Sequence, residues 1–324
     1  MNAVSNPVLI VAGPTASGKS ACALDVAEEF NGAIINADSM QVYAELRILT
    51  ARPPQADEAR VPHRLFGVLS AFEACSAGRW LKMATAEIES AWAAGRLPIV
   101  CGGTGLYIKA LTEGLSEIPE IPKEIRARAG ALYDRIGGEA FRGELAALDR
   151  DAAARLPSGD RQRLTRAWEV VTHTGASMAS WQAKSSAPPL AARFAGITLT
   201  PPRQDLHAAC AARFERMLAA GAVAEVRALL GLGLDPGLPA MKALGVPELA
   251  AHIRGEMSLD EAAEKAKIAT RRYAKRQNTW IRTQMGGAGD GYKAGAAVFS
   301  AKYSESIREE IFSFIRQFLL TTRR

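Results

Sequence analysis

The sequence predicts an α/β fold with a parallel sheet core, a helical insertion and a helical C-terminal part. First, a short apolar run at 8–12 passes directly into a glycine-rich turn and a helical pattern. Second, further strand-like runs alternate with helical patterns, as in sheets built from crossover units. Third, strand signals vanish from an Ala-, Arg-, Glu- and Leu-rich stretch. We therefore expect a core of 1–114 and 190–285, a helical insertion of 115–189, and a flexible segment with a C-terminal helix in 286–324.

The first turn has the spacing of a phosphate-binding loop, G-x-x-x-x-G-K-[ST]. Its glycines let backbone N–H groups turn toward an anion, Lys19 adds a positive charge, and the Ser20 hydroxyl can hold Mg²⁺. The following helix presents its positive end to the same anion. A glycine-rich turn without a ligand is the alternative, which the flanking strand and helix disfavour. We predict a P-loop NTPase-like core in which a diphosphate contacts Gly13, Pro14, Thr15, Ala16, Ser17, Gly18, Lys19 and Ser20.

Two other strand ends are expected beside this loop. The run AIINAD predicts a strand that ends at Asp38, and the run 99–101 predicts a buried strand followed by two glycines and a helix that opens at Thr104. Ligands of open α/β sheets gather beyond the carboxyl ends of the strands, so Asp38 should lie near the loop. Thr104 is either a helix cap or a ligand contact. With runs 64–70 and 194–200, the latter as the last, the sheet would have five strands.

The insertion and the C-terminal part are predicted to be helical. In the insertion, Asp160 is expected to cap a helix that turns Leu164 and Trp168 inward and leaves Gln162, Arg163 and Arg166 exposed. The stretch 213–230 indicates one helix or a broken pair. A long helix over 258–284 should bury Leu259, Ala262, Ala266, Ala269, Tyr273 and Trp280 and expose Lys265, Lys267, Arg271, Arg272, Lys275, Arg276 and Arg282.

Composition narrows the class of protein. The 324 residues carry a net charge of +6, which suggests a polyanionic partner, although a solvated basic face is the commoner reason for a run of cations. No apolar run is long enough to span a membrane, and the N-terminus lacks the features of an export signal. Four scattered cysteines and four histidines without ligand spacing favour reduced thiols and no zinc site. We expect a cytosolic protein, and no membrane or obligate protein partner is inferred.

Two kinds of chemistry fit a diphosphate loop with a carboxylate opposite it. A kinase usually adds a carboxylate for Mg²⁺ and an arginine-rich lid, but the strand at 99–101 ends in glycines. A carboxylate can instead deprotonate a nucleophile that attacks the carbon bearing the diphosphate, so that the loop stabilises the leaving group.

Six blocks in order resemble the bacterial tRNA dimethylallyltransferases, or isopentenyltransferases. They are GPTASGKS at 13–20, DSMQVY at 38–43, GGTGLY at 102–107, DRQRLTRAWEV at 160–170, RFERML at 213–218 and TRRYAKRQNTWIRTQ at 270–284. The resemblance implies transfer of a dimethylallyl group from dimethylallyl diphosphate to the exocyclic amine of the adenine just 3′ of the anticodon in tRNA, with Mg²⁺. An adenine amine is a poor nucleophile, which agrees with a need for a base and a good leaving group.

The resemblance also implies roles for single residues. Asp38 would be the general base, and Thr104 and Arg213 would contact the diphosphate and the adenine. The implied tRNA contacts are Asp38, Ser39, Met40, Gln41, Thr104, Arg126, Gln162, Arg163, Leu164, Thr165 and Arg166, and we add Arg271, Arg272, Lys275 and Arg276 from the basic face of the long helix.

One departure from the family's pattern is Val246-Pro247, where the family often has Tyr and a basic residue after Gly245. Any contact made by those side chains is therefore in doubt here. A small-molecule or nucleotide kinase and an RNA-binding NTPase remain the alternatives to a prenyl transferase.

Overall fold

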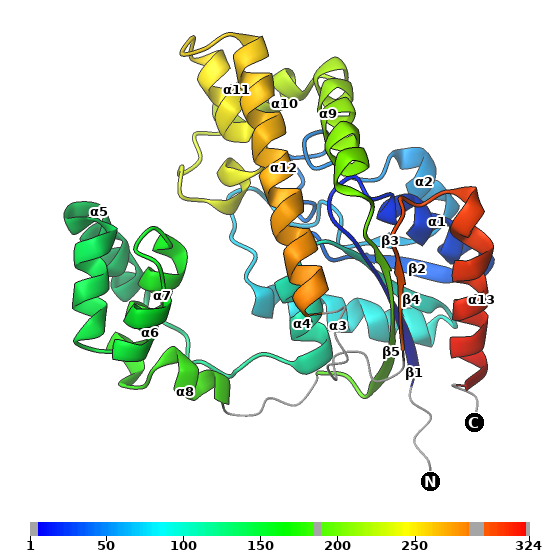
Figure 1. Ribbon diagram of the computed structural model, residues 1–324, viewed down its shortest axis with the longest axis horizontal. Coiled ribbons are helices and arrows are strands. Elements are labelled where there is room, and N and C mark those ends of the chain that lie inside the picture. Colours follow the sequence, from blue (N-terminus) through cyan, green and yellow to red (C-terminus); the bar gives the residue numbers. More distant parts are fainter. Residues whose placement is uncertain (1–5, 184–188, 285–294, 322–324) are drawn as a thin grey trace. The chain divides into compact units, whose positions relative to one another are not determined.

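The computed structural model describes residues 6–183, 189–284 and 295–321. The chain divides into two compact units: 1–112 with 189–324, and 113–188. We call the first the core unit and the second the insert unit, and describe each by itself (Figure 1).

The core unit contains a six-stranded sheet in which every neighbouring pair is parallel, in the order β3-β2-β4-β1-β5-β6. β1 lies near the middle of the sheet, so the carboxyl ends of β4 and β5 lie on either side of its own carboxyl end. The outer strand β3 is only two residues long. The strands are β1 (Asn6–Ala12), β2 (Gly32–Asn36), β3 (His63–Arg64), β4 (Leu97–Gly102), β5 (Ala192–Leu199) and β6 (Ala296–Phe299).

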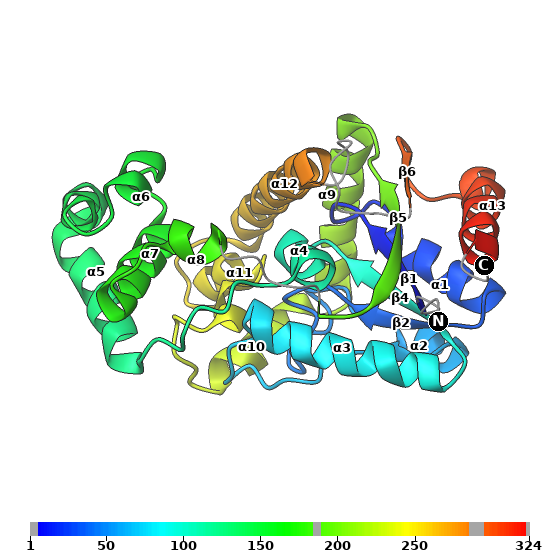
Figure 2. The ribbon, with the colours of Figure 1, turned by 90° about the horizontal axis from the view of Figure 1, so that it is seen from below.

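Alternate residues of the strands face two separate apolar layers. Leu9 and Val11 of β1 pack with α1 (Lys19–Glu29) and α13 (Glu305–Thr321) on one face of the sheet. Val8 and Ile10 face the opposite layer, where the other helices of the core unit pack. Figure 2 shows α1 and α13 together on one side of the strands. The second layer is formed by α3 (Ala77–Ala93), α4 (Gly105–Glu113), α9 (Arg203–Ala219), α10 (Ala222–Gly231), α11 (Val246–Ile253) and α12 (Leu259–Gln284).

The sheet differs from the predicted one at both edges. The run 64–70 was expected to be a strand, but Leu65 and Gly67 have positive φ and only the bridge between Tyr43 and Leu69 extends the pairing beyond β3. The prediction of a full strand there was wrong, because turn geometry breaks the run. β5 is not the last strand, since the unexpected β6 pairs with its outer edge. The predicted flexible stretch 286–295 lies almost wholly outside the described residues.

Helices fit the predictions better than strands. Helix α3 buries Trp80, Ala84 and Ile88. The stretch 213–230 is the broken pair α9 and α10, because Gly221 has a φ of 99° between them. Short helices α2 (Gln55–Arg60) and η1 (Pro239–Lys242) complete the unit. Among the described residues, no helix is long and apolar enough to cross a membrane.

Helix α12 buries a different face from the one that apolar periodicity predicts. Ala262 and Ala266 are buried as expected, but Leu259 is 37% exposed, and Gln277 is 5% exposed. Tyr273 and Trp280 are only partly buried. The C-terminal half of the helix turns a polar residue inward because that residue has hydrogen-bond partners in the core.

The insert unit has its own apolar core. Helices α5 (Lys123–Ala146), α6 (Arg150–Arg155), α7 (Arg161–Thr174) and α8 (Met178–Ala183) form it. Phe141, Leu164 and Trp168 are buried together. The Asp160 side chain accepts a hydrogen bond from the N–H of Arg163 and so caps α7, as predicted.

Candidate active site

The phosphate loop joins β1 to α1 at the carboxyl end of the sheet. Gly18 has a φ of 89°, and the N–H of Ser17 donates to the Pro14 carbonyl at 3.2 Å, which closes the turn. A Cβ on Gly13 would lie 2.5 Å from the Ser17 hydroxyl, so glycine is required there by space. The loop therefore has the compact backbone that turns N–H groups toward an anion.

Gln277 of α12 connects the phosphate loop to the turn that follows β4. Its Oε1 accepts from the N–H of Thr15 at 2.8 Å, and its Nε2 donates to the Gly103 carbonyl at 3.0 Å. Gly103 leaves space for this contact, since a Cβ there would lie 2.2 Å from Nε2. We did not single out Gln277 from the sequence, because an isolated glutamine in a basic helix gives no signal of burial.

Asp38 is held by the end of β2. The Oδ1 of Asn36 accepts a hydrogen bond from the N–H of Asp38 at 2.8 Å, and the Nδ2 of Asn36 donates to the Asp38 carbonyl at 3.0 Å. The Asp38 Oδ1 accepts from the N–H of Met40 at 2.9 Å. Within the described residues, the second carboxylate oxygen accepts no hydrogen bond from the protein. The carboxylate is thus fixed through one oxygen and offers the other to a ligand.

Lys19 and Arg213 carry positive charge on the same side as Asp38. Burial lowers the pKa of Lys19, while Cys101 and Asp38 oppose that shift. Burial also lowers the pKa of Arg213, and Asp38 again opposes it. The Cys101 thiol beside Lys19 stays neutral, because burial raises its pKa to about 11. Two partly desolvated cations therefore lie close to one carboxylate.

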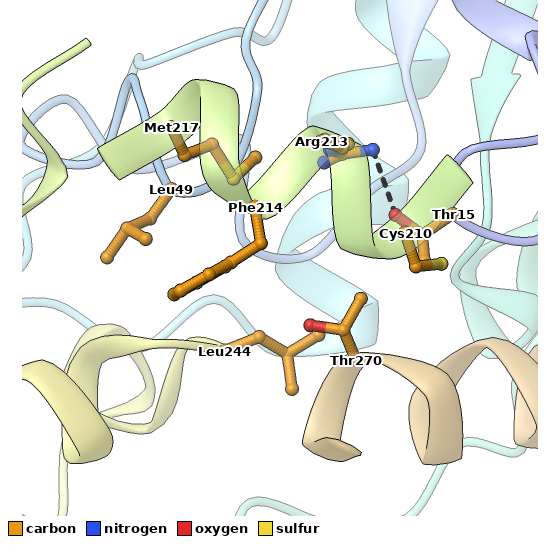
Figure 3. A pocket seen from close by; sticks show the side chains of 8 residues that line it. All are labelled: Thr15, Leu49, Cys210, Arg213, Phe214, Met217, Leu244 and Thr270. Atoms are coloured by element: carbon orange, nitrogen blue, oxygen red, sulfur yellow. Dashed lines mark hydrogen bonds between the residues drawn. The ribbon is translucent and has the colours of Figure 1, made fainter. Parts of the chain in front are cut away.

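Arg213 on α9 reaches the phosphate loop directly. Its Nη1 donates to the Thr15 Oγ1 at 2.9 Å and its Nη2 to the Thr50 carbonyl at 3.3 Å. Figure 3 shows the guanidinium turned toward Thr15, with Phe214 and Met217 of the same helix around a small apolar recess. The recess has a volume of about 30 Å³, and its other lining residues are Leu49, Cys210, Leu244 and Thr270.

Thr104 precedes α4 and holds the segment after Asp38. Its Oγ1 accepts from the N–H of Ser39 at 3.0 Å, and its own N–H donates to the Ala37 carbonyl at 3.1 Å. Burial and the charge of Asp38 raise the pKa of Tyr273, and hydrogen bonds with Thr104 and Gln277 oppose that rise. Thr104 therefore lies at the start of the helix and bonds the residues on either side of Asp38, but it lines neither of the two cavities beside that carboxylate.

Two cavities meet at Asp38. The larger, of about 490 Å³, contains Lys19, Ser20 and Gln41 in its lining, and the smaller, of about 220 Å³, contains Tyr273 in its lining. Both are lined by Thr15, Asp38 and Arg213. A ligand on the phosphate loop and a second ligand beside Tyr273 would thus share the Asp38 carboxylate between them.

The cations predicted on α12 differ in what surrounds them. Lys267 forms ion pairs with Glu215 and, at 2.7 Å, with Glu264, so it is not available to a polyanion. Arg276 lines the smaller cavity, with its Cζ 5.6 Å from the centre of the Tyr273 ring. Arg272, Lys275 and Arg276 are exposed, and Arg271 is partly buried.

The insert unit holds the remaining predicted contacts. Gln162 and Arg163 are exposed on α7, as is Arg126 on α5, while Arg166 pairs with Glu169 at 3.3 Å. Leu164 is fully buried and Thr165 donates to the Arg161 carbonyl at 2.8 Å from a buried position. The side chains of Leu164 and Thr165 are thus turned inward by the helix period, and a tRNA contact of this segment stays a prediction.

The departure at 246–247 lies at the start of α11. Gly245 has a φ of 91° and Val246 is buried in the core, with Pro247 in the first turn. Proline suits this place, because the first-turn N–H groups have no partner within the helix. The side chains at these positions serve the fold.

The sequence matches two family descriptions. Residues 41–284 match the family described as IPP transferase, and residues 6–68 match isopentenyl transferase. Among relatives, the chain is 56% identical over 285 residues to the tRNA dimethylallyltransferase of Rhodospirillum centenum, covering 88% of this chain and 91% of that protein. It is 52% identical to that of Paramagnetospirillum magneticum, covering 99% of both chains.

Solved structures of related proteins also resemble this chain. The crystal structure of the tRNA isopentenylpyrophosphate transferase from Bacillus halodurans is 28% identical with a TM-score of 0.69, and the match covers 98% of each chain. A eukaryotic dimethylallyltransferase acting on tRNA has the same fold, with a TM-score of 0.82 at 23% identity over 98% of this chain and 80% of that one. The two family matches together span residues 6–284, and they include both the loop after β1 and Asp38 after β2. We conclude that this chain belongs to the IPP transferase family.

Proposed function

We propose that the chain transfers a dimethylallyl group from dimethylallyl diphosphate to the exocyclic amine of the adenine just 3′ of the anticodon in tRNA. The observation that carries the proposal is the position of Asp38. Its carboxylate lines the same 490 Å³ cavity as Lys19 and Ser20, and it also lines the cavity beside Tyr273. Relatives at more than 50% identity are named tRNA dimethylallyltransferase, which supports the same reaction.

The donor's diphosphate would bind to the loop. Backbone N–H groups of Gly18, Lys19 and Ser20, the Lys19 ammonium and the positive end of α1 would stabilise the charge of the diphosphate, which grows as it leaves. Arg213 adds a cation beside Thr15. The larger cavity also has Ile48 and Met217 in its lining, and the carbon chain of the donor would lie against them.

The acceptor adenine would occupy the smaller cavity. Its amine nitrogen attacks the first carbon of the dimethylallyl group, the bond from that carbon to the diphosphate oxygen breaks, and the amine proton passes to Asp38. The oxygen of Asp38 that has no protein donor is suited to accept that proton. Because the base must leave its stack to reach Asp38, a single-stranded loop is the substrate that this geometry favours.

Mg²⁺ fits the larger cavity as a partner of the diphosphate. Among the described residues, no group of three or more His, Cys, Asp or Glu side chains is gathered to hold a metal. Mg²⁺ does not need such a cage, because it is usually bound by one or two protein oxygens together with phosphates and waters. The exposed Ser20 hydroxyl at the start of α1 would supply a protein oxygen, and the ion would neutralise charge on the diphosphate.

Contact with the tRNA backbone would come from α12 and from the insert unit. Arg272, Lys275 and Arg276 are exposed on the same helix that carries Gln277. In the insert unit, Arg163 has 75% of its side chain exposed. A tRNA substrate also implies that the protein works in the cytosol.

The experiment that tests the reaction uses labelled dimethylallyl diphosphate, Mg²⁺ and unmodified tRNA, with labelled ATP as the control donor. Label should enter tRNA from the prenyl donor alone. Label transferred from ATP to a small molecule or a nucleotide would instead support a kinase, and ATP hydrolysis stimulated by RNA would support an RNA-binding NTPase.

A second measurement tests the tRNA surface. The double variant Arg163→Ala with Arg166→Ala should weaken tRNA binding and reduce the slope of log K against log salt by about 0.7–0.9 for each lost phosphate contact. The matched control removes Arg60 and Arg316, which are exposed and form ion pairs with Glu28 and Glu29 of α1. Equal slopes for the two double variants would remove α7 from the interface.

A further inference from the structure

Tyr303, between β6 and α13, contacts the phosphate loop through its backbone. Its N–H donates to the Ser17 carbonyl at 3.1 Å. A Cβ placed on Gly18 would lie 2.8 Å from the Tyr303 Cβ. The two segments are therefore so close that any side chain at position 18 would clash with Tyr303. The closeness shows that Gly18 is required both for its φ of 89° and for its contact with Tyr303.

The side chain of Tyr303 fixes this contact to the helix that follows the loop. Its hydroxyl donates to the Asp25 Oδ2 at 2.7 Å. Burial and the hydrogen bond to Asp25 raise the pKa of Tyr303, so the hydroxyl remains a donor. Tyr303 therefore holds the loop at Ser17 and α1 at Asp25, two places more than one helical turn apart.

The elements on either side of Tyr303 anchor it to the core unit. Upstream, the N–H of Thr200 donates to the Phe299 carbonyl at 2.8 Å and continues the pairing of β5 with β6. Downstream, the rings of Phe312 in α13 and Phe30 pack edge to face, 5.4 Å apart. Figures 1 and 2 both show α13 beside α1.

The Tyr303 side of this contact lies beyond the residues that the family models match. Those matches cover residues 41–284 and 6–68, whereas β6, Tyr303 and α13 lie after both. Within the match, Gln277 holds the first half of the loop at Thr15. The second half, from Ser17 to Gly18, is held by the C-terminal segment.

We propose that Tyr303 is a positioning residue for the diphosphate-binding loop, so that affinity for the donor depends on the C-terminal segment. The residue touches no substrate. It sets the Ser17–Gly18 backbone, from which the N–H of Gly18 would reach the diphosphate, an inference that rests on the proposed role of the loop. Loss of the side chain should therefore affect the donor and leave tRNA binding unchanged.

The test measures binding of inorganic pyrophosphate with Mg²⁺ to the full chain by calorimetry, together with KM for each substrate. Tyr303→Ala should raise the Kd for pyrophosphate and the KM for dimethylallyl diphosphate by about tenfold, with KM for tRNA and kcat within about twofold of the unaltered protein. Tyr303→Phe, which keeps the ring and loses the bond to Asp25, should raise both donor values by only about threefold.

Phe312→Ala is the matched control, because it loosens α13 on α1 without touching the loop. It should lower the melting temperature at least as much as Tyr303→Ala but raise the Kd for pyrophosphate less, because Tyr303 keeps its own contacts with Ser17 and Asp25. An unchanged Kd in Tyr303→Ala, or an equal rise in Phe312→Ala, would overturn the inference. Failure of the unaltered protein to bind pyrophosphate would instead overturn the diphosphate role of the loop, and this inference with it.

Discussion

The turn after β1 and the turn after β4 begin from similar sequences, GPTASGKS and CGGTGLY, at the ends of neighbouring strands. In the first, glycine supplies a positive φ at Gly18 and leaves a backbone concavity beside a cavity. In the second, glycines make room for protein: a Cβ on Gly102 would lie 2.2 Å from the Ala37 backbone, and one on Gly105 would lie 2.2 Å from the Trp280 ring. The first turn lines the larger cavity and needs a glycine for its positive φ, whereas the glycines of the second turn are needed for close packing.

The turn after β4 also bears on the proposed chemistry, because it holds the segment that carries Asp38. The N–H of Ala37 donates to the Cys101 carbonyl, and Thr104 holds Ala37 and Ser39 from the other side. Asp38 lies between those two residues. In the proposed reaction, the anion would bind to the turn after β1, and the general base would lie in the segment secured by the turn after β4. Four substitutions separate these roles.

Asp38→Asn should have the largest effect. The amide oxygen can still accept from the N–H of Met40, so the segment keeps its conformation, but the side chain cannot take a proton from the amine. We expect kcat to fall by about 10²–10⁴-fold, the usual contribution of a general base. Single-turnover assays should show this fall, while filter binding shows unchanged tRNA affinity. An equal loss of tRNA affinity would mean that Asp38 binds the substrate and is not its base.

Lys19→Met tests the turn after β1 by removing its charge at nearly constant size. Loss of a charge-assisted bond of about 1.5–3 kcal/mol should raise the Kd for pyrophosphate by about 10- to 100-fold. The control is Lys82→Met, which removes the same charge from an exposed site on α3. Similar Kd values for the two variants would show that the loop does not bind the diphosphate.

Sequence patterns found the ligand-binding turn more readily than the contacts that support it. Lys19 and Ser20 follow from a local motif, and Asp38 follows from its place at a strand end. Gln277 lies 262 residues from its partner Thr15, and Tyr303 lies 286 residues from Ser17. Neither contact can be predicted from the periodicity or the composition of the sequence.

The errors on α12 and at the sheet edges have different physical origins. Helical projection treats apolar residues as the buried ones, yet α12 buries Gln277 because two backbone groups satisfy its amide. The run 64–70 is apolar enough for a strand, but the positive φ at Leu65 and Gly67 ends the pairing. The four-residue β6 is too short for an alternating pattern to reveal it. Burial of Gln277 and pairing of β6 thus depend on distant backbone, whereas the run 64–70 is ended by its own backbone conformation.

Gln277→Ala tests the link between the two turns. It leaves the Thr15 N–H and the Gly103 carbonyl without their partner, so the free energy of unfolding should fall by about 1–3 kcal/mol. Chemical denaturation measures this loss, and kcat should fall with it because both turns are released. The control is Asn278→Ala, since the Asn278 Oδ1 is buried without a hydrogen-bond partner among the described residues. If the two variants are equally stable, the bridge through Gln277 contributes nothing to the fold.

Thr104→Val should have the smallest effect, and it separates positioning from substrate contact. Valine keeps the shape but cannot accept from the Ser39 N–H, so the segment around Asp38 should loosen by the worth of one hydrogen bond, about 0.5–1.5 kcal/mol. If Thr104 only positions that segment, kcat falls several-fold, the Kd for pyrophosphate is unchanged, and Thr104→Ser restores kcat. A matching rise in that Kd would instead show that the hydroxyl also binds the diphosphate, and the turn after β4 would then share the anion with the turn after β1.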